Sequence, residues 1–301
     1  MTRQAPTGPS AAQPPSVAIV AGGAAVLQRR TAWVPAQDRR LVVGLQVLIG
    51  VTVLALWELA IAIELAEPLI FSSPLRIADR MASMLSGEIV YGRTIYDHIG
   101  TTFQQIVVGY VIGASSAVVV GYVLGRTSLV RRMLEPIILA LFSIPKIALA
   151  PLFVLVLGIG FWSKVGIVFI EVFFVVFFNT LKGVMDVSEE YVHLARIMGA
   201  RRLDVGRRVI LPAALPSILI GLKMGVPFAI IGAVLGEYIA SNRGLGWYIL
   251  YSTNSFDASG LWAGILFLVA ITWLLTQIVN VVSTRVLKWQ PPRRGRTISI
   301  A

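Results

Sequence analysis

Six long apolar segments alternate with polar ones along this chain of 301 residues. They cover residues 41–63, 106–124, 137–158, 165–181, 218–239 and 262–287. An α-helix rises 1.5 Å per residue, so about 20 apolar residues cross the roughly 30 Å hydrocarbon core of a bilayer. We therefore predict an all-α membrane protein with about six transmembrane helices.

Two of these segments carry residues that shape a helix. Small residues recur at every fourth position of the second segment, a spacing that lets another helix approach closely: Gly109, Gly113, Ala117, Gly121 and Gly125. The third segment contains Pro145 and Pro151. Proline breaks or kinks a helix, and broken helices at membrane depth are tolerated where they face protein or a water-filled cavity. We predict that the third span is broken at both prolines.

The polar segments on one side of the spans predict surface structure. After Pro74, residues 75, 77, 81, 84 and 85 form an apolar stripe, which predicts an amphipathic helix at the outer surface. We predict a second short surface helix towards Thr101, and an outer loop over residues 241–260. The Pro-rich, Ala-rich residues 1–40 predict a disordered tail, and residues 291–301 a basic tail, on either side of a membrane domain at 41–290.

The composition agrees with a membrane protein and excludes several classes of function. Hydrophobic residues make up 56% of the chain and charged residues only 14%, which a soluble globule could not solvate. The net charge of +11 lies in short segments between apolar ones rather than in one patch, so we expect no nucleic-acid partner. With no cysteine and two histidines, we expect neither disulfides nor a metal site.

The basic residues indicate how the spans are oriented. With six spans, the basic groups near residues 29–40, 126–132, 189–208 and 288–296 all fall on one side of the membrane. The opposite loops carry three arginines against five acidic residues, at positions 64, 67, 79, 88 and 97. The positive-inside rule therefore predicts that both termini are cytoplasmic.

The longest polar loop of the C-terminal half, residues 186–216, predicts a short helix followed by a turn. Asp186 and Ser188 are candidate caps, and Glu189 stands at capping-box spacing from Asp186. Tyr191, Ala195 and Met198 share one helical face. Gly199 can adopt the positive φ that ends a helix.

This loop resembles the cytoplasmic loop of permease subunits of ATP-binding-cassette (ABC) importers. Their signature is Glu-Ala-Ala, three residues, Gly, nine residues, Ile-x-Leu-Pro. This chain has His193-Leu194-Ala195, Gly199 and Val209-Ile210-Leu211-Pro212 at the same spacing, with His193 and Leu194 departing from the signature. The resemblance extends over roughly residues 70–290 and includes residues 73–75, 144–149, 153–164 and 244–246. The most similar subgroup is the nitrate, taurine and alkanesulfonate type.

The resemblance implies a type I importer permease in the bacterial cytoplasmic (inner) membrane, surrounded by membrane lipids. Two copies would pair, two cytoplasmic ATPase subunits that bind ATP and Mg²⁺ would dock on the loop, and an external or periplasmic solute-binding protein would deliver a small anion such as nitrate, taurine or another sulfonate. The residues implied in coupling are Tyr191, His193, Ala195, Arg196, Met198, Gly199, Leu211 and Pro212. Because His193 replaces a carboxylate, we expect docking to depend mainly on the apolar face and on Arg196.

No residues in this chain form a recognisable catalytic set, and no G-x-x-x-x-G-K-[ST] loop holds a nucleotide. We therefore expect a transport subunit rather than an enzyme. We expect no cofactor bound by this chain. Candidate translocation-path residues are polar or helix-breaking groups within the spans: Pro145, Lys146, Glu171, Asn179 and Glu237. Lys146 would face a polar cavity, pair with Glu171 or Glu237, or extend to the cytoplasmic interface.

Two other classes stay open at this point. An ion-coupled secondary carrier or a channel would use Lys146, Glu171 and Glu237 as an ion relay, because buried ionisable groups are costly and usually functional. A membrane-embedded enzyme is the second alternative, although the chain offers no catalytic residues for it.

Overall fold

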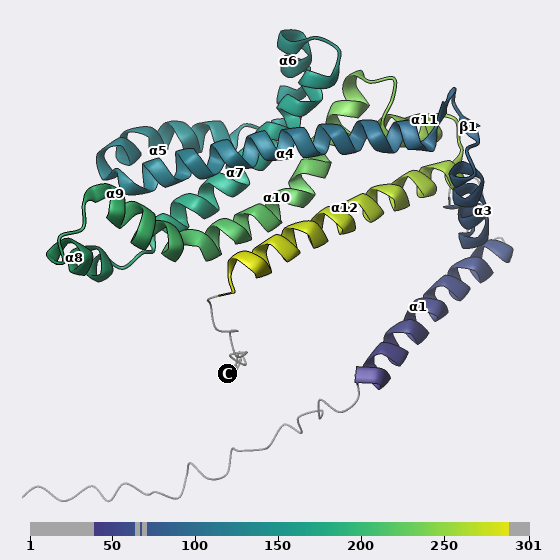
Figure 1. The fold of residues 1–301 in the computed structure, drawn as a ribbon. Coiled ribbons are helices and arrows are strands. Elements are labelled where there is room, and N and C mark those ends of the chain that lie inside the picture. Colours follow the sequence, from purple (N-terminus) through teal and green to yellow (C-terminus); the bar gives the residue numbers. More distant parts are fainter. Residues whose placement is uncertain (1–38, 64–66, 68–70, 289–301) are drawn as a thin grey trace, which may run out of the picture. The chain divides into compact units, whose positions relative to one another are not determined.

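The computed structural model describes residues 39–63, 67 and 71–288 (Figure 1). The chain divides after Val53 into two units. The described part of the first unit, residues 39–53, belongs to helix α1 (Arg39–Ala62), whose side chains from Leu41 to Gly50 are all exposed. The second unit, from Leu54 onwards, contains the rest of α1 and every other element of the described residues.

The second unit is almost entirely helical, which confirms the predicted class. In chain order its elements are α3 (Pro74–Leu85), β1 (Ile89–Val90), β2 (Arg93–Thr94), α4 (Ile95–Arg126), α5 (Ser128–Ser143), α6 (Lys146–Leu157), α7 (Phe161–Met185), α8 (Glu189–Ile197), α9 (Arg202–Val205), a π-helical turn (Gly206–Ile210), α10 (Leu211–Ala240), α11 (Leu245–Asn254) and α12 (Ala258–Val286). The two short strands pair antiparallel, with Ile89 opposite Thr94.

Five helices of the described residues are long and apolar enough to cross a membrane, and the bent pair α5–α6 makes six if it counts as one span. The bend is 92° and lies at Ile144-Pro145. A residue before proline is disfavoured in the helical conformation, and Ile144 is extended (φ −68°, ψ 128°), so α5 stops at Ser143. The predicted break at Pro145 is confirmed. The predicted break at Pro151 is wrong, because α6 continues through this residue.

The second span begins eleven residues earlier than its apolar segment. Thr94 and Asp97 form a capping box, in which each side chain accepts a hydrogen bond from the other residue's backbone N–H, at 3.4 and 3.2 Å. This box fixes the first turn of α4 at Ile95. The predicted separate surface helix towards Thr101 is therefore wrong, since these residues are the first turns of α4. The predicted helix after Pro74 is confirmed as α3, with Ile77 and Met84 buried.

The fifth span is also longer than its apolar segment, because helix covers Arg202–Ala240 without interruption. Pro212 and Pro216 lie inside this run rather than in a stiff loop. Pro212 is the second residue of α10, and the π-helical turn before it supplies a local change of hydrogen bonding. The predicted outer loop 241–260 contains one further helix, α11.

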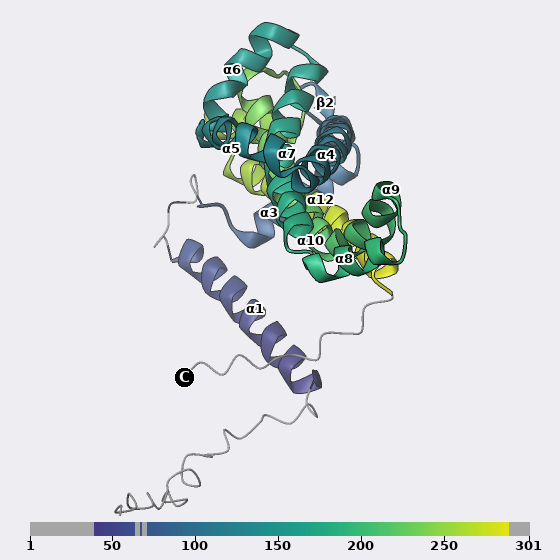
Figure 2. The same ribbon diagram turned by 90° about the vertical axis from the view of Figure 1, so that its left-hand side faces the viewer.

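Helix α7 forms the centre of the second unit, between α4 and α10 (Figures 1 and 2). Its buried residues Val168, Val172, Val176 and Phe177 belong to one apolar core that also includes residues of α4 and α10. Glycines bring the two neighbouring helices close: a Cβ at Gly113 of α4 would lie 2.9 Å from the Phe169 carbonyl oxygen. On the other side, a Cβ at Gly232 of α10 would lie 2.9 Å from Val168 Cα. The small-residue stripe predicted to allow close helix packing is confirmed.

We predict that Gly113→Ala destabilises this packing. The new methyl group would meet backbone atoms of Phe169, which cannot move aside without shifting α7. Overpacking of this kind costs about 1–3 kcal/mol. Thermal unfolding of the purified protein in detergent should give a lower midpoint for Gly113→Ala than for the wild-type chain.

Gly100→Ala is the matched control, because Gly100 lies on the same helix with nothing within 4 Å of an added Cβ. Alanine has the better helix propensity, so this variant should be as stable as wild type or more stable. Equal midpoints for the two variants would contradict the proposed close contact.

Candidate functional site

The polar loop between α7 and α10 forms a short helix, α8, which starts at a serine cap. The Ser188 hydroxyl accepts a hydrogen bond from the Glu190 N–H at 3.3 Å. The alternative cap, Asp186 with Glu189, is wrong. Asp186 keeps a helical conformation (φ −75°, ψ −2°) as the C-cap of α7, so it cannot begin the next helix.

Gly199 ends α8 in the left-handed conformation, as the sequence predicts, with φ +83°. The Gly199 N–H donates to the Arg196 carbonyl at 2.9 Å, and the Ala200 N–H donates to the Ala195 carbonyl at 3.0 Å. These two bonds form a Schellman motif, which stops the helix and turns the chain towards α9. The angle between α8 and the following segment is therefore fixed by backbone hydrogen bonds.

The tip of this loop exposes large apolar side chains. The exposed residues are Tyr191, Leu194, Ile197, Met198 and Leu203. The exposed fraction is 83% for Ile197, 79% for Met198 and 81% for Leu203. Ala195 is half-buried. The prediction named Tyr191 and Met198 but missed Leu194, Ile197 and Leu203, although the spacing of 191, 194 and 197/198 also marks one helical face. An apolar surface outside the spans is typical of a protein interaction site.

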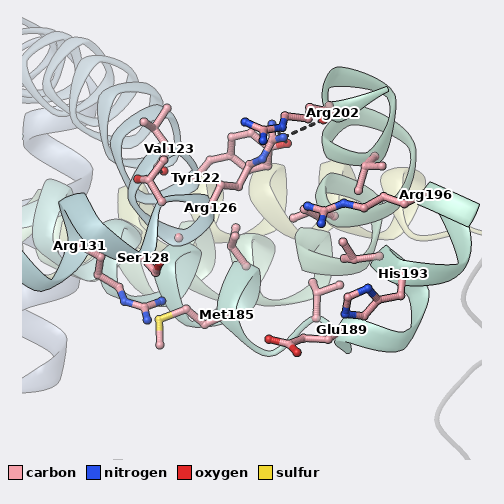
Figure 3. Close-up of a pocket in the computed structure, with 17 residues that line it drawn as sticks. Tyr122, Val123, Arg126, Ser128, Arg131, Met185, Glu189, His193, Arg196 and Arg202 are labelled. Carbon is pink, nitrogen blue, oxygen red and sulfur yellow. Dashed lines mark hydrogen bonds between the residues drawn. The ribbon is translucent and has the colours of Figure 1, made fainter. Parts of the chain in front are cut away.

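A cavity of about 830 Å³ lies behind α8 (Figure 3). It is lined by the ends of α4 and α7, the start of α5, and by α8 and α9, and among its lining residues are His193 and Arg196. Arg126, the last residue of α4, donates to the Arg202 carbonyl at 2.8 Å and to the Tyr122 hydroxyl at 3.3 Å. Arg126 therefore ties the end of α4 to the loop that follows α8.

The last two signature residues lie at the start of α10. Leu211 and Pro212 are the first two residues of this helix and are half-buried. Leu211 packs against a small core of Val184, Ala214 and Ile218, which joins α10 to the end of α7. This core holds the base of α10 against the helix that leads into α8.

Of the predicted path residues, the structure brings Pro145, Lys146 and Glu171 together and places the other two elsewhere. Pro145 and Lys146 form the bend between α5 and α6. The Lys146 Nζ lies 4.7 Å from the Phe142 ring centre and 5.8 Å from the Phe174 ring centre. Glu171 is buried on α7, three residues before Phe174 and so about one turn from a ring that Lys146 contacts. Among the described residues, Lys146 forms no ion pair.

Asn179 and Lys223 are two further polar residues within the spans. The Asn179 amide donates to the Val175 carbonyl of its own helix at 2.8 Å. Lys223 was not predicted. It is half-buried near the middle of the helical run Arg202–Ala240. Its signal in the sequence is a single cation within a long apolar segment, which is unusual at membrane depth.

Glu237 is fully buried and lies in a different network at the C-terminal end of α10. We call this end of the helices, away from α8, the outer end. Its carboxylate accepts hydrogen bonds from the Thr102 hydroxyl at 2.8 Å and from the Gly246 N–H at 2.7 Å. Thr102 in turn accepts from the Leu245 N–H at 2.7 Å. This outer network joins α4, α10 and the start of α11, and it does not bring Glu237 to Lys146. The residue Gly244, with φ +110°, lets the chain turn tightly into α11.

A second outer cluster surrounds Asp257, the cap of α12. Its carboxylate accepts from the Gly260 N–H at 2.8 Å and from the Tyr91 hydroxyl at 3.0 Å, and it pairs with Arg80 of α3 at 3.4 Å. Burial raises the pKa of the neighbouring Tyr248 hydroxyl to about 12, so this group stays protonated at neutral pH. Together these contacts make one ordered outer surface from α3, the hairpin, α11 and α12.

With this geometry established, the comparisons with known proteins identify the family. Residues 109–290 match the family of binding-protein-dependent transport system inner membrane components. The chain belongs to this family. It is therefore a multi-pass membrane protein and a transport permease of the ABC importer type, as the sequence indicates.

Several relatives support the membership. The chain is 30% identical over 237 residues to the formylaminopyrimidine transport permease protein ThiX of Halalkalibacterium halodurans, covering 79% of this chain and 92% of the relative. It is 28% identical to the taurine transport system permease protein TauC of Escherichia coli, covering 87% and 94%. It is 24% identical to the putative aliphatic sulfonates transport permease protein SsuC of Bacillus subtilis, covering 82% and 88%.

A solved structure supports the fold of the permease. An inward-facing form of the MetNI methionine ABC transporter contains a chain with a TM-score of 0.54 and 19% identity, and the match covers 69% of this chain and 98% of that one. At this identity the similarity concerns the arrangement of helices alone.

We predict that Glu237→Ala destabilises the permease. The substitution leaves the buried Gly246 N–H and Thr102 hydroxyl without their acceptor, which costs about 1–3 kcal/mol for each buried group left unpaired. The thermal unfolding midpoint in detergent should fall. Glu237→Gln retains one carbonyl oxygen, so its unfolding midpoint should lie between those of wild type and Glu237→Ala.

Glu135→Ala is the control for this experiment, because Glu135 is exposed on α5. Exposed substitutions of this kind usually change stability by no more than about 0.5 kcal/mol. If Glu237→Ala unfolds at the same temperature as Glu135→Ala, the outer network does not stabilise the fold.

Proposed function

We propose that this permease is the membrane subunit of an ATP-driven importer, and that α8 is the element on which a cytoplasmic ATPase acts. The observation that carries the proposal is a short helix, capped at both ends, that exposes apolar side chains outside the spans. Tyr191, Leu194, Ile197 and Met198 provide the apolar contact, and Arg196 adds a charged group beside it. The ATPase supplies the bound ATP and Mg²⁺.

The contacts behind α8 explain how a displacement reaches the spans. The Schellman motif fixes α8 to the segment that continues through α9 into α10. Arg126 holds the same segment to the end of α4, and Gly206 leaves room for its guanidinium group. Because α4 and α10 both pack on α7, a rigid movement of α8 is transmitted to all three helices. A pair of permeases moved in this way would open alternately to either side.

The basic residues support a cytoplasmic position for α8. The α4–α5 connection and the α8–α9 loop line one common cavity, so both lie at the same end of the helices. Arg126, Arg131 and Arg196 belong to this end, whereas α3, the hairpin and α11 belong to the other. Under the positive-inside rule the basic end faces the cytoplasm, which also places both termini there. The ordered outer surface then faces the solute-binding protein.

For the substrate, we propose a small anion, such as taurine or another sulfonate. Two relatives are named for taurine and for aliphatic sulfonates, and two lysines, Lys146 and Lys223, lie away from the two ends of their spans. A cation at membrane depth attracts an anionic group that has lost its water. The relative ThiX is named for a formylaminopyrimidine, so uptake of that compound instead of an anion would contradict this assignment.

An ion-coupled carrier fits the geometry less well. Its relay would run through Lys146, Glu171 and Glu237. Both carboxylate oxygens of Glu237 accept hydrogen bonds from Thr102 and Gly246 at the outer end of α10, which suits an anchoring role.

We predict that Gly199→Val uncouples transport from ATP hydrolysis. A left-handed conformation costs an L-residue about 1–2 kcal/mol, and more for a β-branched one, so α8 should lose its fixed angle. Copurification of the ATPase and substrate-stimulated ATP hydrolysis should both fall roughly five- to thirtyfold, the factor that such a strain corresponds to.

Gly92→Val is the matched control, because Gly92 has φ +82° and open space around it, but lies in the hairpin at the other end of the protein. It should carry the same strain and still copurify with the ATPase. Full ATPase binding and stimulation by Gly199→Val would contradict the role of α8.

A second prediction concerns the path. Lys146→Met keeps the length of the side chain and its contact with Phe142 and Phe174 but removes the charge. Uptake of radiolabelled taurine or sulfonate into vesicles should fall, while the amount of assembled complex stays constant. Lys223→Met tests the second cation in the same way.

Lys182→Met is the control, because Lys182 is exposed in the last turn of α7, away from the middle of the spans. If uptake is unchanged in both Lys146→Met and Lys223→Met, neither lysine attracts the transported anion.

A further inference from the structure

The cavity behind α8 is strongly basic. Four arginines line it, Arg126, Arg131, Arg196 and Arg202, together with His193, against one carboxylate, Glu189. Figure 3 shows the guanidinium groups of Arg131 and Arg196 pointing into the space from opposite sides. Arg126 uses two of its donors on Arg202 and Tyr122 and lies at the boundary of the cavity. A cavity with this charge attracts an anion.

An apolar groove continues from the same place. It has a volume of about 340 Å³ and lies between the last turns of α4 and the start of the helical run that leads into α10. Its lining includes Val118, Val119, Leu203 and Leu211, and one cation, Arg207. Tyr122, Val123 and Arg126 line both the groove and the basic cavity. The two spaces thus adjoin at these three residues, and the apolar groove extends further back along α4, to Val118, than the basic cavity does.

The cavity lies at the ends of two candidate membrane spans. Arg126 is the last residue of α4 and Met185 the last residue of α7, and both line the basic cavity. A phospholipid lying along these helix ends would have its headgroup beside the cavity and its acyl chain beside the groove. Basic pockets between transmembrane helices on the cytoplasmic side suit anionic headgroups.

We infer that this is a binding site for an anionic phospholipid, with the headgroup phosphate among Arg131, Arg196 and Arg202 and an acyl chain in the groove of α4 and α10. A soluble anion would use the cavity but not the groove. An acidic loop of the ATPase would also use the cavity alone. The inference rests on the proposed cytoplasmic position of the basic end, but it does not need the proposed coupling role of α8.

The test measures lipid retention rather than transport. The full-length permease is purified in detergent, incubated with equal amounts of phosphatidylglycerol and phosphatidylcholine, and examined by native mass spectrometry. We expect one phosphatidylglycerol per chain to be retained in preference to phosphatidylcholine. The double variant Arg131→Gln/Arg202→Gln should lose retention, by roughly fivefold for each arginine removed.

The double variant Arg132→Gln/Arg208→Gln is the matched control. It removes the same charge from neighbouring positions that line neither space. Equal loss in both double variants would show a general surface attraction and overturn the site. Unchanged retention of phosphatidylglycerol by Arg131→Gln/Arg202→Gln would also overturn the site.

Two further measurements separate the other occupants. Inorganic phosphate added at the same concentration as the lipid should not displace phosphatidylglycerol, because phosphate cannot fill the apolar groove. Displacement at equal concentration would assign the cavity to a free anion. The experiment is then repeated with the ATPase bound. If ATPase binding removes the lipid and itself requires Arg131 and Arg202, the occupant is the protein partner and the inference is wrong.

Discussion

The close approach of α4 and α10 to α7 is the constraint on which the rest of the permease depends. Lipid tails are as apolar as leucine, so helices in a membrane associate through packing rather than through removal of apolar surface from water. Here the packing depends on glycine: backbone atoms of α7 lie where Cβ atoms of Gly113 and Gly232 would otherwise stand. The three helices therefore move as one body, with little freedom for one to slide against another.

Different interactions hold the short helices at the two ends of these three long helices. At the outer end, buried hydrogen bonds from Thr102 and Gly246 to Glu237 hold the start of α11, and these are strong because no water competes for them. At the basic end, an exposed backbone turn at Gly199 and the single side chain of Arg126 hold α8 and α9. The outer end is thus held by buried side-chain hydrogen bonds, whereas the basic end is held by an exposed turn and leaves its apolar tip open to solvent.

Much of this arrangement could be predicted from local sequence. Hydropathy located the spans, Gly199 marked the turn after α8, and Pro145 marked the break, because each signal acts within a few residues. Features decided by distant contacts could not be predicted. Thr102 and Glu237 are 135 residues apart, and nothing near Glu237 reveals its partner. Asp186 does not cap α8, because α7 continues to Met185 and Asp186 is the C-cap of that helix. The sequence pattern does not show whether a capping residue ends one helix or begins the next.

The departure of His193 from the importer signature has a physical consequence in this geometry. His193 lines the cavity with Arg196 and three further arginines, and Glu189 is its one carboxylate. A glutamate at position 193 would add a second negative charge to this space, where it would attract the arginines and oppose a bound anion. Imidazole adds no negative charge in either protonation state, so the cavity stays cationic. In this chain the position that is acidic in the signature therefore favours an anion behind α8, while the apolar residues at the tip of the loop remain free for contact with a partner.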